Sequence, residues 1–210
     1  MRKTKIGAIA SGSGSNFEAI VQSTKKGILK NKATVEVLIC NKAGKYCMER
    51  AKNHDIPHIL IESDKYDGSR EDFDRKMIKV LKNYECELIV LVGYMRLVSS
   101  IFIEAFKGNV MNIHPALLPS FKGLHAHRDV LEYGVKVSGC TVHFVDKEKD
   151  HGPIILQKCV PVLDTDTEET LGKRVLEWEH KIFPKCIELF HDKRLRIIGR
   201  KVIIHGKIGL

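Results

Sequence analysis

Short apolar runs alternate with segments of helical periodicity along the first half of the chain. Each run has the length of a buried strand, and between the runs apolar residues recur at helical spacing, as Phe73, Met77 and Leu81 do. Strands that alternate with helices predict an α/β fold with a doubly wound, mostly parallel sheet. The predicted strands lie at 5–10, 34–40, 58–61, 88–92 and 110–113, and the predicted helices start near Ser15, Lys45, Ser69 and Ser99 or Ser100.

The pattern changes in the second half, where two strands follow each other without a helix between them. The apolar runs at 138–145 and 154–160 are joined only by a polar stretch, which favours an antiparallel pair. The sheet is therefore predicted to become mixed in the carboxyl-terminal half. The other predicted elements are a helix at 126–132, a long helix capped by Thr165 with Glu168 and kinked or interrupted at Pro184, and a hairpin of 195–198 with 201–205 around a type II′ turn at Gly199-Arg200.

The composition is typical of a globular protein with a substantial core. The chain has 210 residues, of which 43% are hydrophobic, and we expect a single domain. Lys and Arg number 35 against 26 Asp and Glu, which gives a net charge of +9. Apart from a modest cluster at 193–201, the basic residues are spread along the chain and are not interleaved with aromatic residues. The pattern favours a solvated basic surface over nucleic-acid binding.

The spacing of cysteine and histidine does not favour a metal site. The six cysteines form no CxxC pair, and four lie in apolar runs, which is typical of small buried side chains in a reducing compartment. His125 and His127 form a tight pair, but without a nearby cysteine or an HExxH pattern. The apolar run near the amino terminus is too short for a secretory signal, and no stretch approaches the about 18 apolar residues of a spanning helix. We expect a cytoplasmic protein with no metal and no membrane segment.

A glycine- and serine-rich stretch follows the first predicted strand directly. Residues 12–16, here called the phosphate loop, lead into a helix for which Ser15 and Glu18 predict a capping box. Backbone N–H groups and the helix dipole favour a phosphate there. Phe17 occupies the third glycine position of a dinucleotide fingerprint, and Asn41 stands where a ribose-binding acid is expected, so one phosphate monoester suits the loop better than a dinucleotide. The alternative is a flexible turn without a ligand.

Asn112 and His114 are predicted to lie side by side at the end of a strand. Pro115 lacks an N–H and favours an extended residue before it, so the strand stops at His114. Alternate side chains of a strand point the same way, and ligands of open α/β sheets bind at the carboxyl ends of the strands. An amide and an imidazole would therefore converge on one ligand. The alternative is a hydrogen-bonded histidine with no chemical role.

A second apolar segment ends a predicted strand. The segment 93–98 contains Met95, Leu97 and Val98, which would form a wall for a flat ring. The alternative is that these side chains belong to a core that continues into the next helix.

Two stretches, NIHPALLP at 112–119 and GLHAHR at 123–128, combine with the phosphate loop and the acidic loop at 146–150. Together they resemble the folate-dependent formyltransferase family, from Gly12 to about Leu195. The resemblance implies a single Rossmann-like domain over 1–210, with a phosphate-binding half at about 1–100 and a catalytic, folate-binding half at about 101–210. It also implies transfer of a formyl group from 10-formyltetrahydrofolate to the amine of a glycinamide ribonucleotide, with small-molecule substrates, no metal, no nucleic acid and a monomer or homodimer.

The resemblance also implies a role for particular residues. The catalytic residues would be Asn112, His114 and Asp150; the ribonucleotide would contact Gly12, Ser13, Gly14, Ser15, Asn16 and Glu179; the folate would contact Arg70, Met95, Arg96, Leu97, Val98, Asn112 and Asp146.

The implied chemistry suits these residue types. The acceptor amine attacks the formyl carbon, so no serine or cysteine nucleophile is needed. Asn112 and a protonated His114 would donate to the oxyanion, an arrangement that contributes about 10²–10³-fold in rate per donor. Asp150 would favour the protonated imidazole and accept the proton of the amine through a water.

The chain departs from the family pattern in several places. Ala116 stands where serine is frequent, Phe121-Lys122 replaces Tyr-Pro, and His151 replaces a glycine. The carboxyl-terminal hairpin matches poorly, and we assign it no function. Family members that formylate methionyl-tRNA or hydrolyse the folate carry an additional domain, which we do not expect here. Outside the family, a dinucleotide oxidoreductase is disfavoured by Phe17 and Asn41, and a nucleotide-binding module without turnover would not explain Asn112, His114 and Asp150 together.

Overall fold

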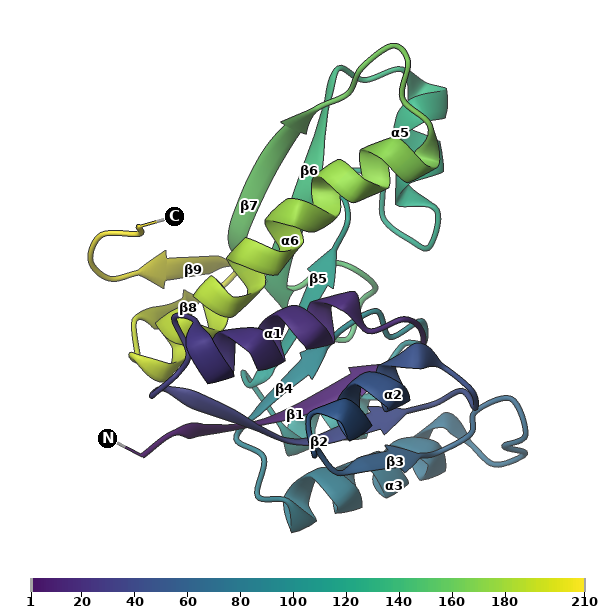
Figure 1. Ribbon diagram of the computed structural model, residues 1–210, viewed down its shortest axis with the longest axis vertical. Helices are drawn as coiled ribbons and strands as arrows, with labels where there is room; N and C mark the ends of the chain where they lie inside the picture. Colours follow the sequence, from purple (N-terminus) through teal and green to yellow (C-terminus); the bar gives the residue numbers. More distant parts are fainter. Residues whose placement is uncertain (1, 210) are drawn as a thin grey trace. The chain divides into compact units, whose positions relative to one another are not determined.

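The computed structural model describes residues 2–209 (Figure 1), which fold into two compact units. The first unit ends at Asn112 and the second begins at Ile113. Strand β5 (Val110–His114) crosses this boundary. The assignment of separate functions to the two halves of one domain stays a prediction.

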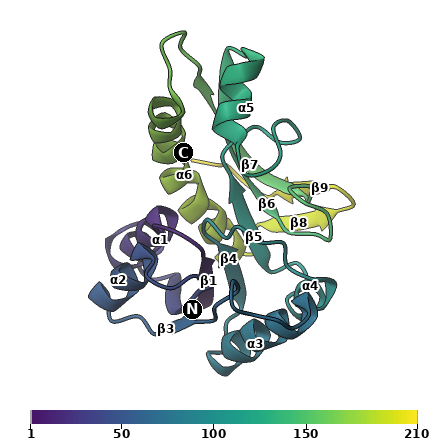
Figure 2. The ribbon, with the colours of Figure 1, turned by 90° about the vertical axis from the view of Figure 1, so that its right-hand side faces the viewer.

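The first unit contains a parallel sheet with helices on both faces, as the alternation of apolar runs predicted. Its strands are hydrogen-bonded in the order β3-β2-β1-β4-β5, and all the neighbouring pairs are parallel. Figure 2 shows α1 and α2 on one side of β1 and β4, with α3 and α4 on the other. The doubly wound arrangement is confirmed. The strands are β1 (Thr4–Ala10), β2 (Ala33–Cys40), β3 (His58–Leu60) and β4 (Leu88–Leu91), and the helices are α1 (Ser15–Lys26), α2 (Tyr46–Asn53), α3 (Arg70–Asn83) and α4 (Ser100–Ala105).

Burial explains why these segments form these elements. Every residue of β4 is buried, as expected for a central strand covered on both faces. The helices contribute Phe17, Phe73 and Phe102, whose side chains have no exposed surface. Apolar residues at helical spacing therefore form the core on both sides of the sheet.

The helix caps of the first unit agree only in part with the sequence. Ser69 caps α3 as predicted, because its Oγ accepts a hydrogen bond of 3.0 Å from the backbone N of Asp72. The predicted capping box of Ser15 and Glu18 is not formed. The N-cap of α1 is Gly14, with a φ of +72° and no side-chain cap, and Ser15 is already helical. The Glu18 carboxylate instead contacts Arg50 of α2 and His54, the residue that follows α2.

The second unit contains the mixed sheet that the sequence predicted. Strands β6 and β7 are antiparallel, β7 and β9 are parallel, and β8 and β9 form an antiparallel hairpin. Figure 1 shows α6 running along β6 and β7, which it covers. The elements are α5 (Ala126–Tyr133), β6 (Val137–Phe144), β7 (Ile154–Pro161), α6 (Glu168–His191), β8 (Leu195–Ile198) and β9 (Lys201–Ile204).

Helix α6 differs from its prediction at the cap. The cap is Thr167 rather than Thr165, because Thr167 and Thr170 exchange hydrogen bonds between side chain and backbone. Pro184 lies inside the helix, which continues through it to His191, so the helix is not interrupted there, and the alternative of a kink at Pro184 stays a prediction. The turn of the final hairpin agrees with the predicted type II′ turn, since Gly199 has the positive φ, +57°, that this turn requires at its first central residue.

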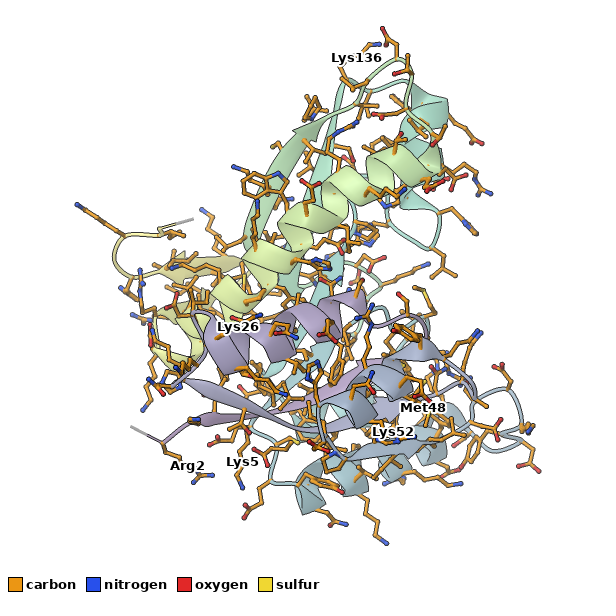
Figure 3. All side chains as sticks on the ribbon, viewed as in Figure 1. Arg2, Lys5, Lys26, Met48, Lys52 and Lys136 are labelled. Atoms are coloured by element: carbon orange, nitrogen blue, oxygen red, sulfur yellow. The ribbon has the colours of Figure 1, made fainter. Side chains whose placement is uncertain are left out.

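The charge and cysteine patterns have simple structural counterparts. Figure 3 shows Lys5, Lys26 and Lys52 on three different elements of the first unit, β1, α1 and α2. All six cysteines are free thiols, four of them buried, while Cys86 is partly buried and Cys159 is exposed. In residues 2–209, no helix is long and apolar enough to cross a membrane.

Candidate active site

The phosphate loop joins the carboxyl end of β1 to the first turn of α1. The backbone N of Glu18 donates to the Gly14 carbonyl at 2.9 Å, so the first turn of α1 starts directly from the loop. Gly14 cannot carry a side chain without strain. Its φ is positive, and a Cβ there would lie 2.6 Å from the Cβ of Cys47. A Cβ on Gly12 would meet no described atom within 4 Å, so that position is open to a ligand.

Helix α2 supports the phosphate loop through a cluster of polar side chains. The Nε of Arg50 donates to the carbonyl of Ser13 at 3.0 Å, and its Nη1 lies 3.3 Å from the Glu18 carboxylate. His54 Nε2 lies 2.9 Å from the same carboxylate. Burial raises the pKa of Glu18, but hydrogen bonds from Gln22 and His54 outweigh burial and hold that pKa below its usual value. No pattern in the sequence indicated this cluster.

Asn41 directly follows β2, beside the end of β1, and has no exposed surface. Its backbone N donates to the Ala10 carbonyl at 3.3 Å, and its side-chain amide donates to Ser63 Oγ at 2.8 Å. The position where a dinucleotide-binding protein places an acid is therefore held by a neutral amide already engaged with Ser63. This arrangement supports the exclusion of a dinucleotide.

The apolar segment after β4 is divided between the surface and the core. Met95 is 55% exposed and Leu97 is 47% exposed, whereas Val98 is buried. The backbone N of Met95 donates to Ser11 Oγ at 2.9 Å, which places this segment beside the start of the phosphate loop. Met95 and Leu97 therefore do not belong to the core, and their contact with a folate ring stays a prediction.

A buried acid ties this segment to α3. Asp74 accepts a hydrogen bond of 2.5 Å from the backbone N of Ser99, and its carboxyl is almost fully buried. Burial raises the pKa of Asp74, while the hydrogen bonds from Ser99 and the charges of Arg70 and Arg96 oppose that shift. Arg70 is exposed at the start of α3, and the Arg96 guanidinium stacks on the ring of Phe73 at 4.9 Å. The helical spacing of α3 marked its apolar residues but gave no sign of Asp74.

In the second unit the structure brings His114 together with Asp150. His114 is the last residue of β5, and Asp150 lies 36 positions later in the loop between β6 and β7. The Nδ1 of His114 lies 3.7 Å from Oδ2 of Asp150, and both side chains are largely buried. The same carboxylate oxygen accepts a hydrogen bond of 3.0 Å from the backbone N of Gly123. An imidazole and a carboxylate thus face each other at low solvent exposure, which suits proton transfer.

The two ring nitrogens of His114 have different surroundings. Nε2 lies 2.7 Å from the carbonyl of Phe121, which can only accept, so Nε2 carries a proton. The distance of 3.7 Å from Nδ1 to Asp150 exceeds that of a hydrogen bond, so the pair is electrostatic and Nδ1 can still bond a ligand. His114 is therefore oriented by one nitrogen and available through the other.

Two departures from the family pattern lie beside His114. Ala116 has no exposed surface, and its carbonyl accepts a hydrogen bond of 2.7 Å from Thr141 Oγ1. Phe121 has a φ of +51°, and its ring packs edge-on against Tyr133 with centroids 5.8 Å apart. Both residues are accommodated by contacts within the second unit.

The loop at 146–152, here called the Asp150 loop, is held by its own side chains. Asp146 accepts from the backbone N of Glu148 at 3.0 Å, and its other oxygen lies 2.8 Å from His151 Nδ1. Gly152 is required, because a Cβ there would lie 1.8 Å from the carbonyl of Phe144. His151, a departure from the family pattern, therefore takes part in the structure of the loop.

The remaining predicted site residues lie on separate elements. Glu179 is buried on α6, and Asn112 is the final residue of the first unit. The convergence of Asn112 with His114 and Asp150 stays a prediction, as do the ligand contacts of both loops. Within residues 2–209, no group of three or more His, Cys, Asp or Glu side chains could hold a metal ion.

Comparisons with known proteins place these features in context. A family described as formyl transferase matches residues 4–187. The chain is 43% identical over 200 residues to phosphoribosylglycinamide formyltransferase of Escherichia coli (strain K12), covering 95% of this chain and 92% of that protein. It is 46% identical over 187 residues, 89% of the chain, to the trifunctional purine biosynthetic protein adenosine-3 of Gallus gallus, but spans only 18% of that protein's length. The crystal structure of glycinamide ribonucleotide transformylase 1 from Symbiobacterium toebii superposes with a TM-score of 0.92 at 45% identity, covering 96% and 94% of the two chains.

Proposed function

We propose that this chain, which belongs to the formyl transferase family, transfers the formyl group of 10-formyltetrahydrofolate to the amine of 5-phosphoribosylglycinamide. The products are formylglycinamide ribonucleotide and tetrahydrofolate, as in purine biosynthesis. The observation that supports this most strongly is the buried pair of His114 and Asp150, 3.7 Å apart. A relative of nearly the same length that carries the corresponding name is 43% identical over most of the chain.

The transfer proceeds by addition and elimination at the formyl carbon. The amine lone pair attacks that carbon, the formyl oxygen becomes anionic, and the bond to the folate nitrogen then breaks as that nitrogen takes the proton that the amine has lost. His114 donates to the oxyanion through Nδ1, because its Nε2 is bonded to the Phe121 carbonyl. Asp150 stabilises the imidazolium and accepts the proton lost by the amine, through a water.

Asn112 supplies the second oxyanion donor. It lies two residues before His114 in the same strand, and its neutral amide complements a cationic imidazole without competing for protons.

The other predicted residues divide between the two substrates. The phosphate loop holds the ribonucleotide through backbone N–H groups, which the open space around Gly12 favours. Glu179 contacts the glycinamide amine. The folate is bound by the apolar segment after β4, in which Met95 and Leu97 are exposed and Val98 is buried. Three charged residues complete the folate contacts: Arg70, Arg96 and Asp146.

We also propose that the protein acts in the cytoplasm on small molecules alone, without nucleic acid, as a monomer or homodimer. Free thiols and scattered basic side chains support this proposal.

The direct test is to mix the protein with both substrates and follow folate deformylation by absorbance. We expect release of tetrahydrofolate that requires glycinamide ribonucleotide and is lost in His114→Ala. Deformylation at the same rate without the ribonucleotide would instead indicate a hydrolase.

A further inference from the structure

The carboxyl-terminal hairpin, to which the sequence assigned no function, contacts the Asp150 loop. Arg200 lies in the turn between β8 and β9, 49 residues after His151. Its Nη1 lies 2.6 Å from Nε2 of the His151 ring and 3.1 Å from Nδ1. Its Nη2 donates to the backbone carbonyl of His151 at 2.6 Å. One guanidinium thus binds both the side chain and the backbone of a single loop residue.

These contacts determine the hydrogen-bonding state of His151. A guanidinium can only donate, so Nε2 of His151 accepts from Arg200. The Nδ1 proton then points to the Asp146 carboxylate, 2.8 Å away, and the other Asp146 oxygen accepts from the backbone N of Glu148. A continuous chain of polar contacts therefore runs from the hairpin through the whole loop.

Asp150 lies next to this anchor and depends on it. Its φ of +46° lies in the left-handed region, which Asp adopts more readily than most residues with a Cβ but less readily than Gly. Gly152 packs directly against the Phe144 carbonyl. Next to it, the Arg200 bond to the His151 carbonyl fixes the peptide between His151 and Gly152, one residue beyond Asp150. Both anchors directly follow Asp150, whose carboxylate also accepts a hydrogen bond of 3.0 Å from the backbone N of Gly123.

We propose that Arg200 is a positioning residue for formyl transfer, acting through His151 to hold Asp150 at His114. This inference rests on the proposed function and assigns a role to the hairpin. Arg200 touches neither His114 nor Asp150 directly, so its effect depends on the conformation of the loop.

Arg200→Ala tests the inference, with Arg196→Ala as a matched control. Arg196 is exposed on β8 of the same hairpin. We expect kcat to fall roughly 10- to 100-fold in Arg200→Ala, since displacing a catalytic group by about 1 Å has effects of this size. The KM for the ribonucleotide should not change, and Arg196→Ala should keep kcat within about twofold of the wild type. Arg200→Lys keeps the positive charge but not the two-pronged guanidinium, so it should give a kcat between those of the wild type and Arg200→Ala. This second variant keeps the test valid if Arg200→Ala fails to fold.

A double variant separates positioning from general stability. In an Asp150→Asn background, Arg200→Ala should lower kcat by less than about twofold, because both changes remove the same group from His114. Amide hydrogen exchange over 147–152 should also rise in Arg200→Ala and not in Arg196→Ala. Multiplicative losses, unchanged exchange or a wild-type kcat in Arg200→Ala would overturn the inference. A wild-type protein without ribonucleotide-dependent formyl transfer would instead overturn the proposed function on which it rests.

Discussion

The phosphate loop and the Asp150 loop are held in place by different means. The phosphate loop is a strand–turn–helix connection whose key position, Gly14, is determined by backbone φ and by a close approach to Cys47. The Asp150 loop has strained backbone at Asp150 and is held by side-chain contacts, with Arg200 reaching it from a distant hairpin. A site made of backbone N–H groups can thus be formed by one short stretch of chain. A carboxylate, in contrast, must be oriented by groups from several elements.

The largest effect should come from removing the charge that the Asp150 loop presents. Asp150→Asn keeps the size of the side chain, but the oxyanion donor loses its counter-charge and the amine loses its proton acceptor. We expect kcat to fall by at least ~10²-fold with little change in substrate affinity. Steady-state kinetics checks this, and Glu132→Gln on α5, where the side chain is largely exposed, should remain near the wild-type rate. A near wild-type kcat in Asp150→Asn would mean that the loop acid is structural.

A smaller effect should follow from blocking the phosphate loop. Gly12→Val places a side chain where the structure has open space, so it should leave the fold intact and obstruct the anion. We expect ribonucleotide affinity to fall about tenfold or more, by roughly the contribution of one or two charge-assisted hydrogen bonds. Calorimetry with each substrate measures this, and folate affinity serves as the internal control. Gly14→Val is a poor test, because its side chain would collide with Cys47 whether or not a ligand binds.

A still smaller effect should show how far side chains support the phosphate loop. Arg50→Ala removes the donor to the Ser13 carbonyl and a partner of Glu18. We expect ribonucleotide affinity to fall by about three- to tenfold, the contribution of one hydrogen bond from a charged group. Arg75→Ala, an arginine of α3 with a largely exposed side chain, is the control. Equal affinities in the two variants would show that the backbone alone maintains the loop.

The smallest effect is a dependence of stability on pH in the second unit. Burial lowers the pKa of His143 and of His127 below the usual value. The unfolded chain then binds more protons than the folded chain as pH drops below about 6.5, so stability should decrease, by at most about 1.4 kcal/mol per pH unit for each histidine. Urea unfolding at pH 7.5 and 5.5 measures this, and His143→Asn should flatten the dependence. A free energy of unfolding that does not change with pH would contradict the lowered pKa of these two histidines.

The same contrast explains what the sequence could predict. Strand and helix positions followed from apolar periodicity, because burial of β4 and of one face of each helix requires it. The Ser69 cap forms as its local pattern predicts, but the predicted Ser15 cap does not form, and Glu18 instead contacts Arg50 of α2 and His54 just after it. Local chemistry is visible in the sequence only where no distant partner competes for it.

Side-chain contacts between segments that are distant in the chain are not marked by any pattern in the sequence. Asp74, Arg50 and Arg200 look like solvated charges in the sequence, yet each bonds a backbone N–H or carbonyl of a loop. Asp150 was found by resemblance to the family rather than by its spacing from His114. Its position 3.7 Å from that imidazole depends on the loop's fold, which periodicity does not encode.

The most direct test of formyl transfer is ¹³C NMR of a reaction started with 10-formyltetrahydrofolate labelled at the formyl carbon. With the wild-type protein and glycinamide ribonucleotide, we predict that the label moves to the formamide of the ribonucleotide, one equivalent for each tetrahydrofolate released. Asp150→Asn should slow this transfer by at least ~10²-fold. Label that appears as free formate, or that reaches the ribonucleotide equally fast in Asp150→Asn, would contradict transfer by the His114–Asp150 pair.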